Sequence, residues 1–491
     1  MEAREESQLT VTQRGAKRPG QARAALAAAL PLAVGLAIRL LILKHIFQVS
    51  GDMLVYGDLA RNLLLHGSYS LSMPGGGTYP TLIRLPGYPL FLAACFRLFG
   101  MENYFAVACV QIALDLLGCL LVAAFVRRIT PCAASRGAAL ATLWLASLCP
   151  FTAAYDTASL TETTTLFMLA LAMWAMARFR QYPGWANALW FTFAVTCATL
   201  LRPDGALAAV AFTPALLMGL GRNPSSDSTL WRRAITRRKL MRMAVVCVVL
   251  ALAPFAVWTA RNWRVFHVFE PLAPRLANDP DERPNLGFEH WVKSWCLDFA
   301  STYQIYWRVP GDELDVSMLP RRAFDTPAQY AETAAIAADY TSHGEKITPD
   351  IDAQFQKLAD ERIAADPLRY YLWLPLGRVA DMWLRPRVEN LNIDPEWWVD
   401  AHHKRGTEFS WAYVALNALY LLLGIAGLCM KPRFWGAMLA YMLLRSALLA
   451  TISAPEARYT LECFPMLFAA GGIALGRFLC RRSSDQIQAK P

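Results

Sequence analysis

Charged residues are scarce in this chain of 491 residues, at 18% of the sequence, while hydrophobic residues make up 55%. The mean hydropathy is +0.28. Long runs almost free of charge exclude an ordinary soluble domain and indicate an integral membrane protein. The net charge of +10 could suggest a nucleic-acid-binding protein. The basic residues, however, gather at the ends of apolar segments, so we expect no nucleic-acid partner.

Disulfide motifs and clustered metal ligands are also missing. Most of the 11 cysteines stand inside apolar runs without a Cys-x-x-Cys pair, as small buried hydrophobic residues do. The seven histidines are scattered, and the adjacent pair His402 and His403 is more typical of a solvated loop than of a metal site. No Asn-x-Ser/Thr acceptor occurs with x other than proline, which, with the Ala/Arg-rich composition, favours a bacterial inner membrane.

Ten apolar segments are long enough to span a bilayer, which takes about 20 residues. They are residues 24–43, 104–126, 137–155, 159–177, 186–201, 205–221, 241–260, 409–430, 433–452 and 461–479. The first segment is no cleaved signal peptide, because no small-residue cleavage site closes it before Lys44. The sequence therefore predicts an all-α polytopic membrane protein.

The distribution of basic residues predicts the orientation. The N-terminal tail is basic, and so is every second loop after it, which places both termini in the cytoplasm. This alternation holds only if the apolar segments 85–100 and 367–386, each interrupted by arginine, lie in the membrane interface as amphipathic helices.

The same topology divides the chain. We expect a transmembrane module over 23–260, with a first outer loop at 44–103, a small, mainly helical extracytoplasmic domain over 261–408, and further transmembrane helices over 409–480. Thr326-Pro327 and Thr348-Pro349 signal helix starts within that domain. The cytoplasmic tails are residues 1–22 and 481–491, with disorder expected over 1–22 and 483–491.

Ionisable residues concentrate at the predicted outer face. An ionisable side chain inside or against a bilayer is costly, so each is a functional hypothesis. The set comprises Asp52, Asp58, Arg84, Glu162, Arg202, Asp204, Arg261, Glu456 and Arg458. Because the topology brings all of them to one membrane level, a single site built from several loops is expected.

Two acids open the first outer loop. On a helix, Asp52 and Tyr56 share a face, whereas Asp58 lies six residues from Asp52 and about 240° around the axis, so the two acids form no catalytic pair. We expect Asp58 to be structural, through a local hydrogen bond with Asn62. For Asp52, capping of the helix start competes with a catalytic role.

Two consecutive segments, GDMLVYGDLARNLLLHGSYS (51–70) and IRLPGYPLFLAACFRLFG (83–100), resemble the first outer loop of GT-C glycosyltransferases. More specifically, they resemble the bacterial branch related to protein O-mannosyltransferases and aminoarabinose transferases. Three later segments fit the same family in order: TLLRPDG (199–205), TARNWRVF (259–266) and PEARYTLECFPML (455–467).

The resemblance implies an enzyme that transfers a sugar from a polyprenyl-phosphate-linked donor to a lipid, glycan or protein acceptor outside the membrane. By position, Asp52 matches the general base and Arg84 a donor-phosphate ligand, and Arg458 and Tyr459 match a phosphate-contacting loop. The full set of substrate-binding candidates is Tyr56, Arg84, Tyr88, Glu162, Arg202, Arg261, Arg458 and Tyr459. Leu85 departs from the Pro-Pro of many relatives. Met53 stands where some relatives carry a second acid, which leaves a divalent cation as an open question.

Purely structural roles compete with function for several residues. We expect Arg39 and Arg97, near membrane ends, to snorkel. Arg202 could pair with Asp204 or Glu162, Glu162 could stabilise a helix dipole, and Arg261 could anchor its helix. The competing function is a transporter or a flippase of cell-envelope precursors. Asp115 is then the clearest acid within a span, although no internal repeat supports that class.

Overall fold

A computed structural model describes residues 19–217, 237–391, 393–398 and 404–488. The α-helices are α2 (Pro19–Ile46), α3 (Asp52–His66), α4 (Gly87–Phe99), α5 (Tyr104–Ile129), α6 (Cys132–Leu148), α7 (Pro150–Tyr155), α8 (Thr161–Gln181), α9 (Trp185–Leu201), α10 (Ala206–Leu217), α12 (Arg237–Phe266), α13 (Leu286–Lys293), α14 (Phe299–Ser301), α15 (Pro327–Ser342), α16 (Pro349–Ala365), α17 (Leu374–Leu384), α18 (Lys404–Cys429), α19 (Trp435–Leu449) and α20 (Phe464–Gln488). Short 3-10 helices are η1 (Pro203–Gly205), η3 (Val316–Met318), η4 (Arg321–Ala323) and η6 (Ala457–Cys463), and π-helical turns are η2 (Thr302–Tyr306) and η5 (Arg369–Trp373). The strands β1 (Ser70–Ser72) and β2 (Thr78–Pro80) form one antiparallel hairpin.

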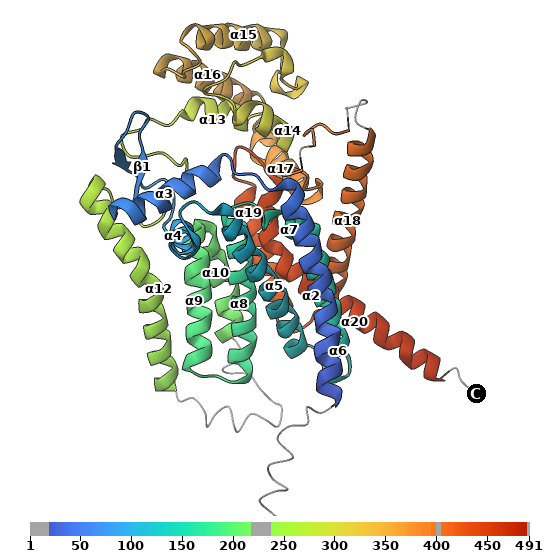
Figure 1. Cartoon of the computed structure of the whole chain (residues 1–491). Coiled ribbons are helices and arrows are strands. Elements are labelled where there is room, and N and C mark those ends of the chain that lie inside the picture. The colour runs from blue at the N-terminus through green and yellow to red at the C-terminus, as the bar shows by residue number, and fades with distance from the viewer. Residues whose placement is uncertain (1–18, 218–236, 392, 399–403, 489–491) are drawn as a thin grey trace, which may run out of the picture.

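The long apolar helices form a bundle (Figure 1). Within the described residues, each of the ten expected spans coincides with a helix or with consecutive helices; residues 218–221 of the span 205–221 lie outside that part of the chain. Five of these are long and apolar enough to cross a membrane: Leu26–Ile46, Tyr104–Ile129, Arg238–Phe266, Lys404–Cys429 and Ala457–Cys480. The protein is thus an all-α polytopic membrane protein, as predicted.

Local sequence explains where helices break and how closely they pack. The expected span 137–155 divides at Cys149 into α6 and α7, because Pro150 starts a new helix and cannot donate a bond to the old one. Helix α20 packs against α6 through glycine: a Cβ on Gly472 would lie 2.7 Å from the Cα of Thr142. Small residues of this kind let the backbones of membrane helices approach closely.

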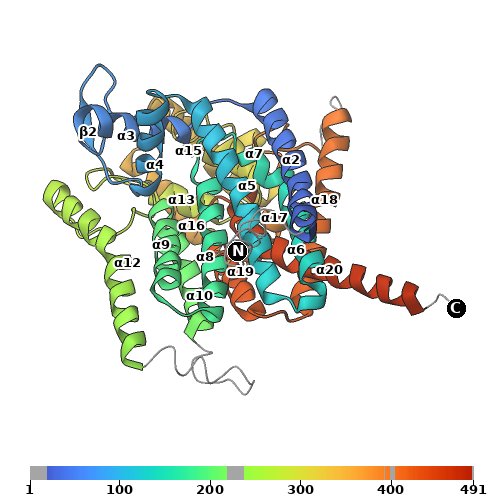
Figure 2. The same cartoon turned by 60° about the horizontal axis from the view of Figure 1, so that its bottom comes forward.

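Helix α12 stands at the edge of the bundle beside α9 (Figure 2). Only 6% of its apolar window is buried within the protein. Its exposed side chains include valines and leucines over 245–257. Such a surface fits contact with lipid.

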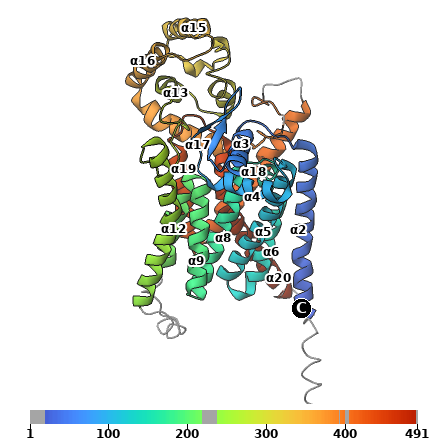
Figure 3. The ribbon, with the colours of Figure 1, turned by 60° about the vertical axis from the view of Figure 1, so that its left-hand side comes forward.

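A helical domain sits on one end of the bundle (Figure 3). We call it the cap and define it as residues 286–384, from α13 to α17. It has its own apolar core, which includes Trp291 and Phe355. The two expected helix starts are confirmed: Thr326 and Thr348 each accept a backbone N–H bond as N-cap, with proline next.

The first loop lies between the bundle and the cap. Figure 1 shows α4 running across the axis of the bundle rather than along it, as expected for an interfacial segment. The β1–β2 hairpin, which the sequence did not indicate, turns at Gly75–Gly77, where all three glycines have positive φ.

The prediction that Arg39 snorkels is wrong. Its side chain is fully buried, and its Nε donates to Asp115 at 3.0 Å and to Asp156 at 2.9 Å. A further bond from Nη1 to the carbonyl of Ser147 is 2.8 Å long. Arg39 therefore ties α2 to α5 and α6. Arg97, in contrast, is exposed at the end of α4.

Both expected tails are partly helical. Helix α2 begins at Pro19 and α20 continues to Gln488, so disorder over 19–22 and 483–488 is a wrong prediction. Residues 1–18 and 489–491 lie outside the described part of the chain, as do His402 and His403.

Candidate active site

A cavity of about 1900 Å³ lies between the cap and the bundle. Its walls come from the start of α3, Arg84, the α9–η1 junction, cap residues 299–308, and the segments 389–397 and 448–459. Five of the predicted site residues line it: Asp52, Arg84, Arg202, Arg458 and Tyr459. Loops far apart in sequence thus meet at one cavity, as expected.

Asp52 and Arg84 form an ion pair on the cavity wall. Arg84 Nη2 donates to Asp52 Oδ1 at 2.9 Å, and the side chain of Asp52 is 42% exposed. The N-cap of α3 is Gly51, with φ of +55°, and Asp52 is the first helical residue. The carboxylate therefore binds Arg84 from a position at which it also suits the helix dipole.

The Arg84 guanidinium is well supported. It lies 5.8 Å from the centre of the Tyr56 ring, and the Tyr69 hydroxyl donates to the carbonyl of Arg84 at 2.9 Å. Burial alone would lower the pKa of Arg84, but Tyr56 and Asp52 outweigh burial and raise it. The group is a fixed cation available to an anionic ligand.

Tyr56 and Tyr88 lie behind this wall. Their rings meet edge to face with centres 5.1 Å apart. Tyr88 is fully buried, and its hydroxyl donates to Gln111 Oε1 at 2.7 Å. The structure brings neither residue to the cavity lining. Their contacts favour a role in positioning Arg84 over direct contact with a substrate.

Asp58 holds the hairpin. Its Oδ2 accepts the backbone N–H of Ser72 at 2.6 Å, and its Oδ1 pairs with Arg61. Asn62 donates instead to the carbonyl of Ser70 at 2.9 Å. The expected Asp58–Asn62 bond is thus replaced by bonds from both residues to β1, while the structural role expected for Asp58 is supported.

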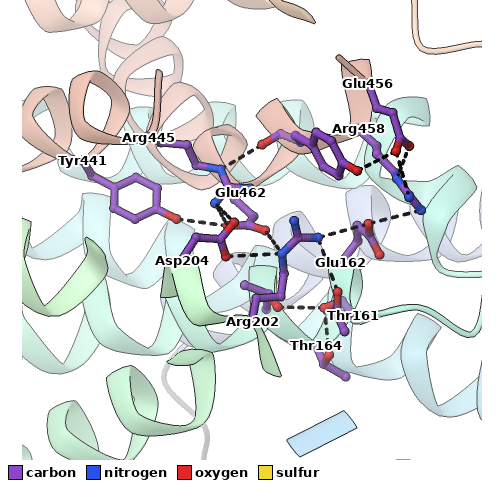
Figure 4. Close-up of polar contacts among 12 residues, drawn as sticks. Thr161, Glu162, Thr164, Arg202, Asp204, Tyr441, Arg445, Glu456, Arg458 and Glu462 are labelled. Carbon is purple, nitrogen blue, oxygen red and sulfur yellow. Dashed lines mark hydrogen bonds and ion pairs between the residues drawn. The ribbon is translucent and has the colours of Figure 1, made fainter. Parts of the chain in front are cut away.

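A network of buried charges forms the floor of the cavity (Figure 4). We call it the Arg202 network; it comprises Glu162, Arg202, Asp204, Arg445, Glu456, Arg458 and Glu462. Arg202 lies 3.3 Å from Glu162, 3.3 Å from Asp204 and 3.0 Å from Glu462. Arg202 therefore pairs with both of the acids considered as its structural partners, in addition to lining the cavity.

Arg445 and Glu462 are the members that the sequence interpretation missed. Arg445 lies 2.8 Å from Asp204 and 2.7 Å from Glu462, and it has no exposed side-chain surface. Both lie within expected spans, 433–452 and 461–479. Their position in the sequence could have identified them, since an ionisable residue inside an apolar span is a functional hypothesis in itself.

Glu162 and Arg458 join the network from the other side. Arg458 Nη1 lies 3.8 Å from Glu162, and its Nε lies 2.5 Å from Glu456. The Tyr459 hydroxyl donates to Glu456 at 2.5 Å. Glu162 is buried beneath the cavity floor, so the structure places it as a partner of arginines and not on the cavity surface.

Arg261 does not reach the cavity. Its Nη1 and Nη2 donate to the carbonyls of Thr81 and Tyr69, each at 2.7 Å. Its guanidinium also lies 5.3 Å from the centre of the Trp258 ring. These contacts fasten the first loop to α12, which favours an anchoring role.

No group of three or more His, Cys, Asp or Glu side chains suited to a metal ion occurs among the described residues. Met53, where some relatives have a second acid, packs with Ala158 and Leu160 in an apolar cluster. The divalent cation stays an open prediction.

Comparisons with known proteins find similar solved structures but no similar sequences. No protein-family model matches the sequence, and no curated protein matches it. The chain is similar to ArnT from Cupriavidus metallidurans bound to undecaprenyl phosphate, at 17% identity and a TM-score of 0.38, over 93% of this chain and 78% of that one. It is also similar to the archaeal oligosaccharyltransferase AglB from Archaeoglobus fulgidus in complex with an inhibitory peptide and a dolichol-phosphate. That match has 13% identity and a TM-score of 0.46, over 94% of this chain and 52% of that one. This chain thus spans about half the length of AglB.

Proposed function

We propose that the protein is a membrane glycosyltransferase of the GT-C type. It transfers a sugar from a polyprenyl-phosphate-linked donor to an acceptor at the outer face of a bacterial inner membrane, with both termini in the cytoplasm. The observation that carries the proposal is the Asp52–Arg84 ion pair at the wall of a large cavity, formed by the two residues that the sequence motifs select.

The proposed sugar transfer requires a general base for the acceptor hydroxyl and cationic groups for the leaving phosphate. Asp52 takes the proton of the acceptor hydroxyl while that oxygen attacks the anomeric carbon. The bond from that carbon to the phosphate oxygen breaks, and the polyprenyl phosphate leaves with the electron pair. Direct displacement inverts the anomeric centre. A positioned general base typically contributes about 10²–10⁴-fold to the rate.

Arginines stabilise the charge on the leaving phosphate. Arg84 and Arg458 are the predicted ligands, and a guanidinium can bind phosphate through two parallel hydrogen bonds. Arg308 also lines the cavity, where its guanidinium lies 5.7 Å from the centre of the Tyr303 ring, and it forms no ion pair within the described part of the chain. We add it to the candidates, because a guanidinium without a carboxylate beside it is free to bind an anionic group.

The alternative, a transporter or flippase, has less support. Such proteins usually place acids and broken helices at the bilayer midplane, often in paired repeats. Asp115, the acid within a span that was the candidate for a transport site, is paired with Arg39 and does not line the cavity.

The test is Asp52→Asn in purified full-length protein. We expect sugar transfer to fall by about 10²-fold or more, while thermal stability and binding of undecaprenyl phosphate stay unchanged. Asp350→Asn, the same change on the exposed surface of the cap, is the control and should transfer normally. Transfer retained in Asp52→Asn would refute Asp52 as the base.

Comparison of envelope glycans and lipids from cells with and without the gene, by mass spectrometry, would identify the product. An unchanged profile with altered solute uptake would refute the transferase and favour the transporter.

A further inference from the structure

One wall of the cavity carries buried polar atoms without partners. Both carboxylate oxygens of Glu389, Nδ2 of Asn390 and the hydroxyl of Tyr155 have no hydrogen-bond partner within the described residues. All three residues line the cavity. They come from two separate elements, the end of α7 and the segment that follows α17.

Unpartnered buried groups are unusual and call for a physical cause. The large majority of buried polar atoms in folded proteins are hydrogen-bonded, and each one left unsatisfied costs about 1–3 kcal/mol. Four such atoms on one cavity wall indicate a surface that a polar ligand completes.

The segment that carries Glu389 is held firmly in place. Arg387 is buried, and its Nη1 donates to Asn417 Oδ1 at 2.6 Å. Asn417 in turn donates to the carbonyl of Trp383 at 2.8 Å. The backbone N–H of Leu391 bonds the carbonyl of Val388 at 2.9 Å. A fixed backbone keeps the unpaired carboxylate at the cavity instead of letting it turn away.

Nearby arginines are engaged elsewhere. Arg385 lies 3.7 Å from Asp381, and its guanidinium lies 5.2 Å from the centre of the Trp398 ring. Arg387 binds Asn417 and Thr460 and lies over Phe464. Neither forms an ion pair with Glu389 in the described part of the chain.

The unpaired atoms define the ligand by their chemistry. Two carboxylate oxygens accept hydrogen bonds, an amide nitrogen donates them, and a phenol hydroxyl does both. Neighbouring hydroxyl groups on a sugar ring, each a donor and an acceptor, complement that set. An acyl chain would leave every one of these atoms unsatisfied, and an ionised phosphate has no hydrogen to donate to the Glu389 oxygens.

We propose that Glu389, Asn390 and Tyr155 bind the hydroxyl groups of the sugar carried by the polyprenyl-phosphate donor. This inference rests on the proposed function. The sugar is esterified directly to the phosphate, so its ring must lie beside the phosphate ligands. Tyr155, Glu389 and Asn390 line the same cavity as the phosphate ligands Arg84 and Arg458, which meets that condition.

Binding measurements test the assignment. The full-length protein in nanodiscs is titrated with undecaprenyl phosphate and with its glucose, mannose, galactose and arabinose esters. We expect the wild type to bind at least one ester about tenfold or more tightly than bare undecaprenyl phosphate. Glu389→Gln should remove most of that increment and leave the affinity for the bare phosphate unchanged, with smaller losses in Tyr155→Phe and Asn390→Ala. Glu313→Gln, an exposed acid of the cap outside the cavity lining, should behave as wild type.

The outcomes separate this inference from the proposed function. If wild type binds no undecaprenyl phosphate, the proposed function fails. If it binds the bare phosphate but gains nothing from any sugar, or if the variants weaken bare phosphate and ester equally, the sugar subsite is refuted. Steady-state kinetics adds a second readout: a raised KM for the donor with unchanged kcat in Glu389→Gln supports sugar binding, whereas a lower kcat at unchanged KM would assign proton transfer to Glu389 and overturn the proposal.

Discussion

Replacing Glu389 by glutamine should stabilise the unliganded protein above neutral pH. Most substitutions of buried polar residues destabilise a protein, but this one removes a carboxylate that has no partner and keeps its shape. Residues that serve a ligand are often held at a cost to stability, so a stabilising change is expected here.

Burial raises the pKa of Glu389 from 4.5 to about 7, although the residue's own backbone amide, Arg387 and Arg385 act to lower it. Folded protein therefore keeps the proton up to about pH 7, whereas unfolded protein loses it above about pH 4.5. The stability of the wild type falls as pH rises between these two values and then levels off. Each pKa unit corresponds to about 1.4 kcal/mol, so the rise from 4.5 to about 7 sets an upper limit of about 3.5 kcal/mol. Because the residue as a whole is only partly buried, we expect about 1–3 kcal/mol.

Thermal unfolding in detergent at pH 5 and pH 8, without donor lipid, measures the effect. The Tm of Glu389→Gln should exceed that of the wild type by a few degrees at pH 8, and the difference should shrink at pH 5. Glu313→Gln should show no difference at either pH, because that side chain is exposed. A variant that melts at or below the wild-type temperature at pH 8 would show that the Glu389 carboxylate has a stabilising partner.

Three further substitutions test the fold. Arg39→Leu should destabilise the protein by about 3–5 kcal/mol, because it leaves the buried carboxylates of Asp115 and Asp156 without their cation. Arg97→Leu, at an exposed site, should leave the Tm unchanged. A Tm of Arg39→Leu equal to that of the wild type would refute the buried ion-pair assignment. Gly472→Ala should lower the Tm and the yield of folded protein, because its Cβ would clash with the backbone of α6, whereas Gly436→Ala, with no atom within 4 Å, should be tolerated. Thr348→Ala should lower the free energy of unfolding of the cap by about 1 kcal/mol, because it removes the N-cap hydrogen bond of α16, and should speed limited proteolysis of the cap at that helix. An unchanged cleavage rate would contradict a stabilising role of this N-cap bond.

The features that the sequence predicted are those that depend on local pattern. Apolar runs located the helices that coincide with the ten expected spans, because the length of a run is a property of consecutive residues. The starts of α15 and α16 were found for the same reason: a threonine followed by proline satisfies the first turn of a helix with its own side chain. The orientation of α4 across the bundle agrees with the interfacial position expected for it, because Arg97 interrupts its apolar run and a span there would reverse the side of every later loop.

The errors depend on which way a side chain points. Arg39 has the sequence position of a snorkelling arginine, but its face of α2 meets α5 and α7, where Asp115 and Asp156 bind it. Asp58 was correctly separated from Asp52, yet its partner came from a hairpin whose strands are only three residues long, too short to leave a periodic pattern. Tertiary neighbours decide both cases.

Charge pairing separates the supporting groups of the cavity from those that face a ligand. Arg202 and Arg445 each lie beside carboxylates from other elements, so their charge is already compensated and their main effect is to hold α8, the end of α9, α19 and η6 together. The Asp52–Arg84 pair is different, because it is partly exposed and single. The surface formed by Glu389, Asn390 and Tyr155 is different again, because its polar atoms have no partner within the described residues.

A ligand that carries both an anionic phosphate and uncharged hydroxyls would use both the Asp52–Arg84 surface and the Glu389 surface at once. A simple anion would use the first surface, and a free sugar the second. The gain from joining the two groups in one molecule is therefore the quantity that distinguishes a polyprenyl-phosphate sugar from either fragment alone.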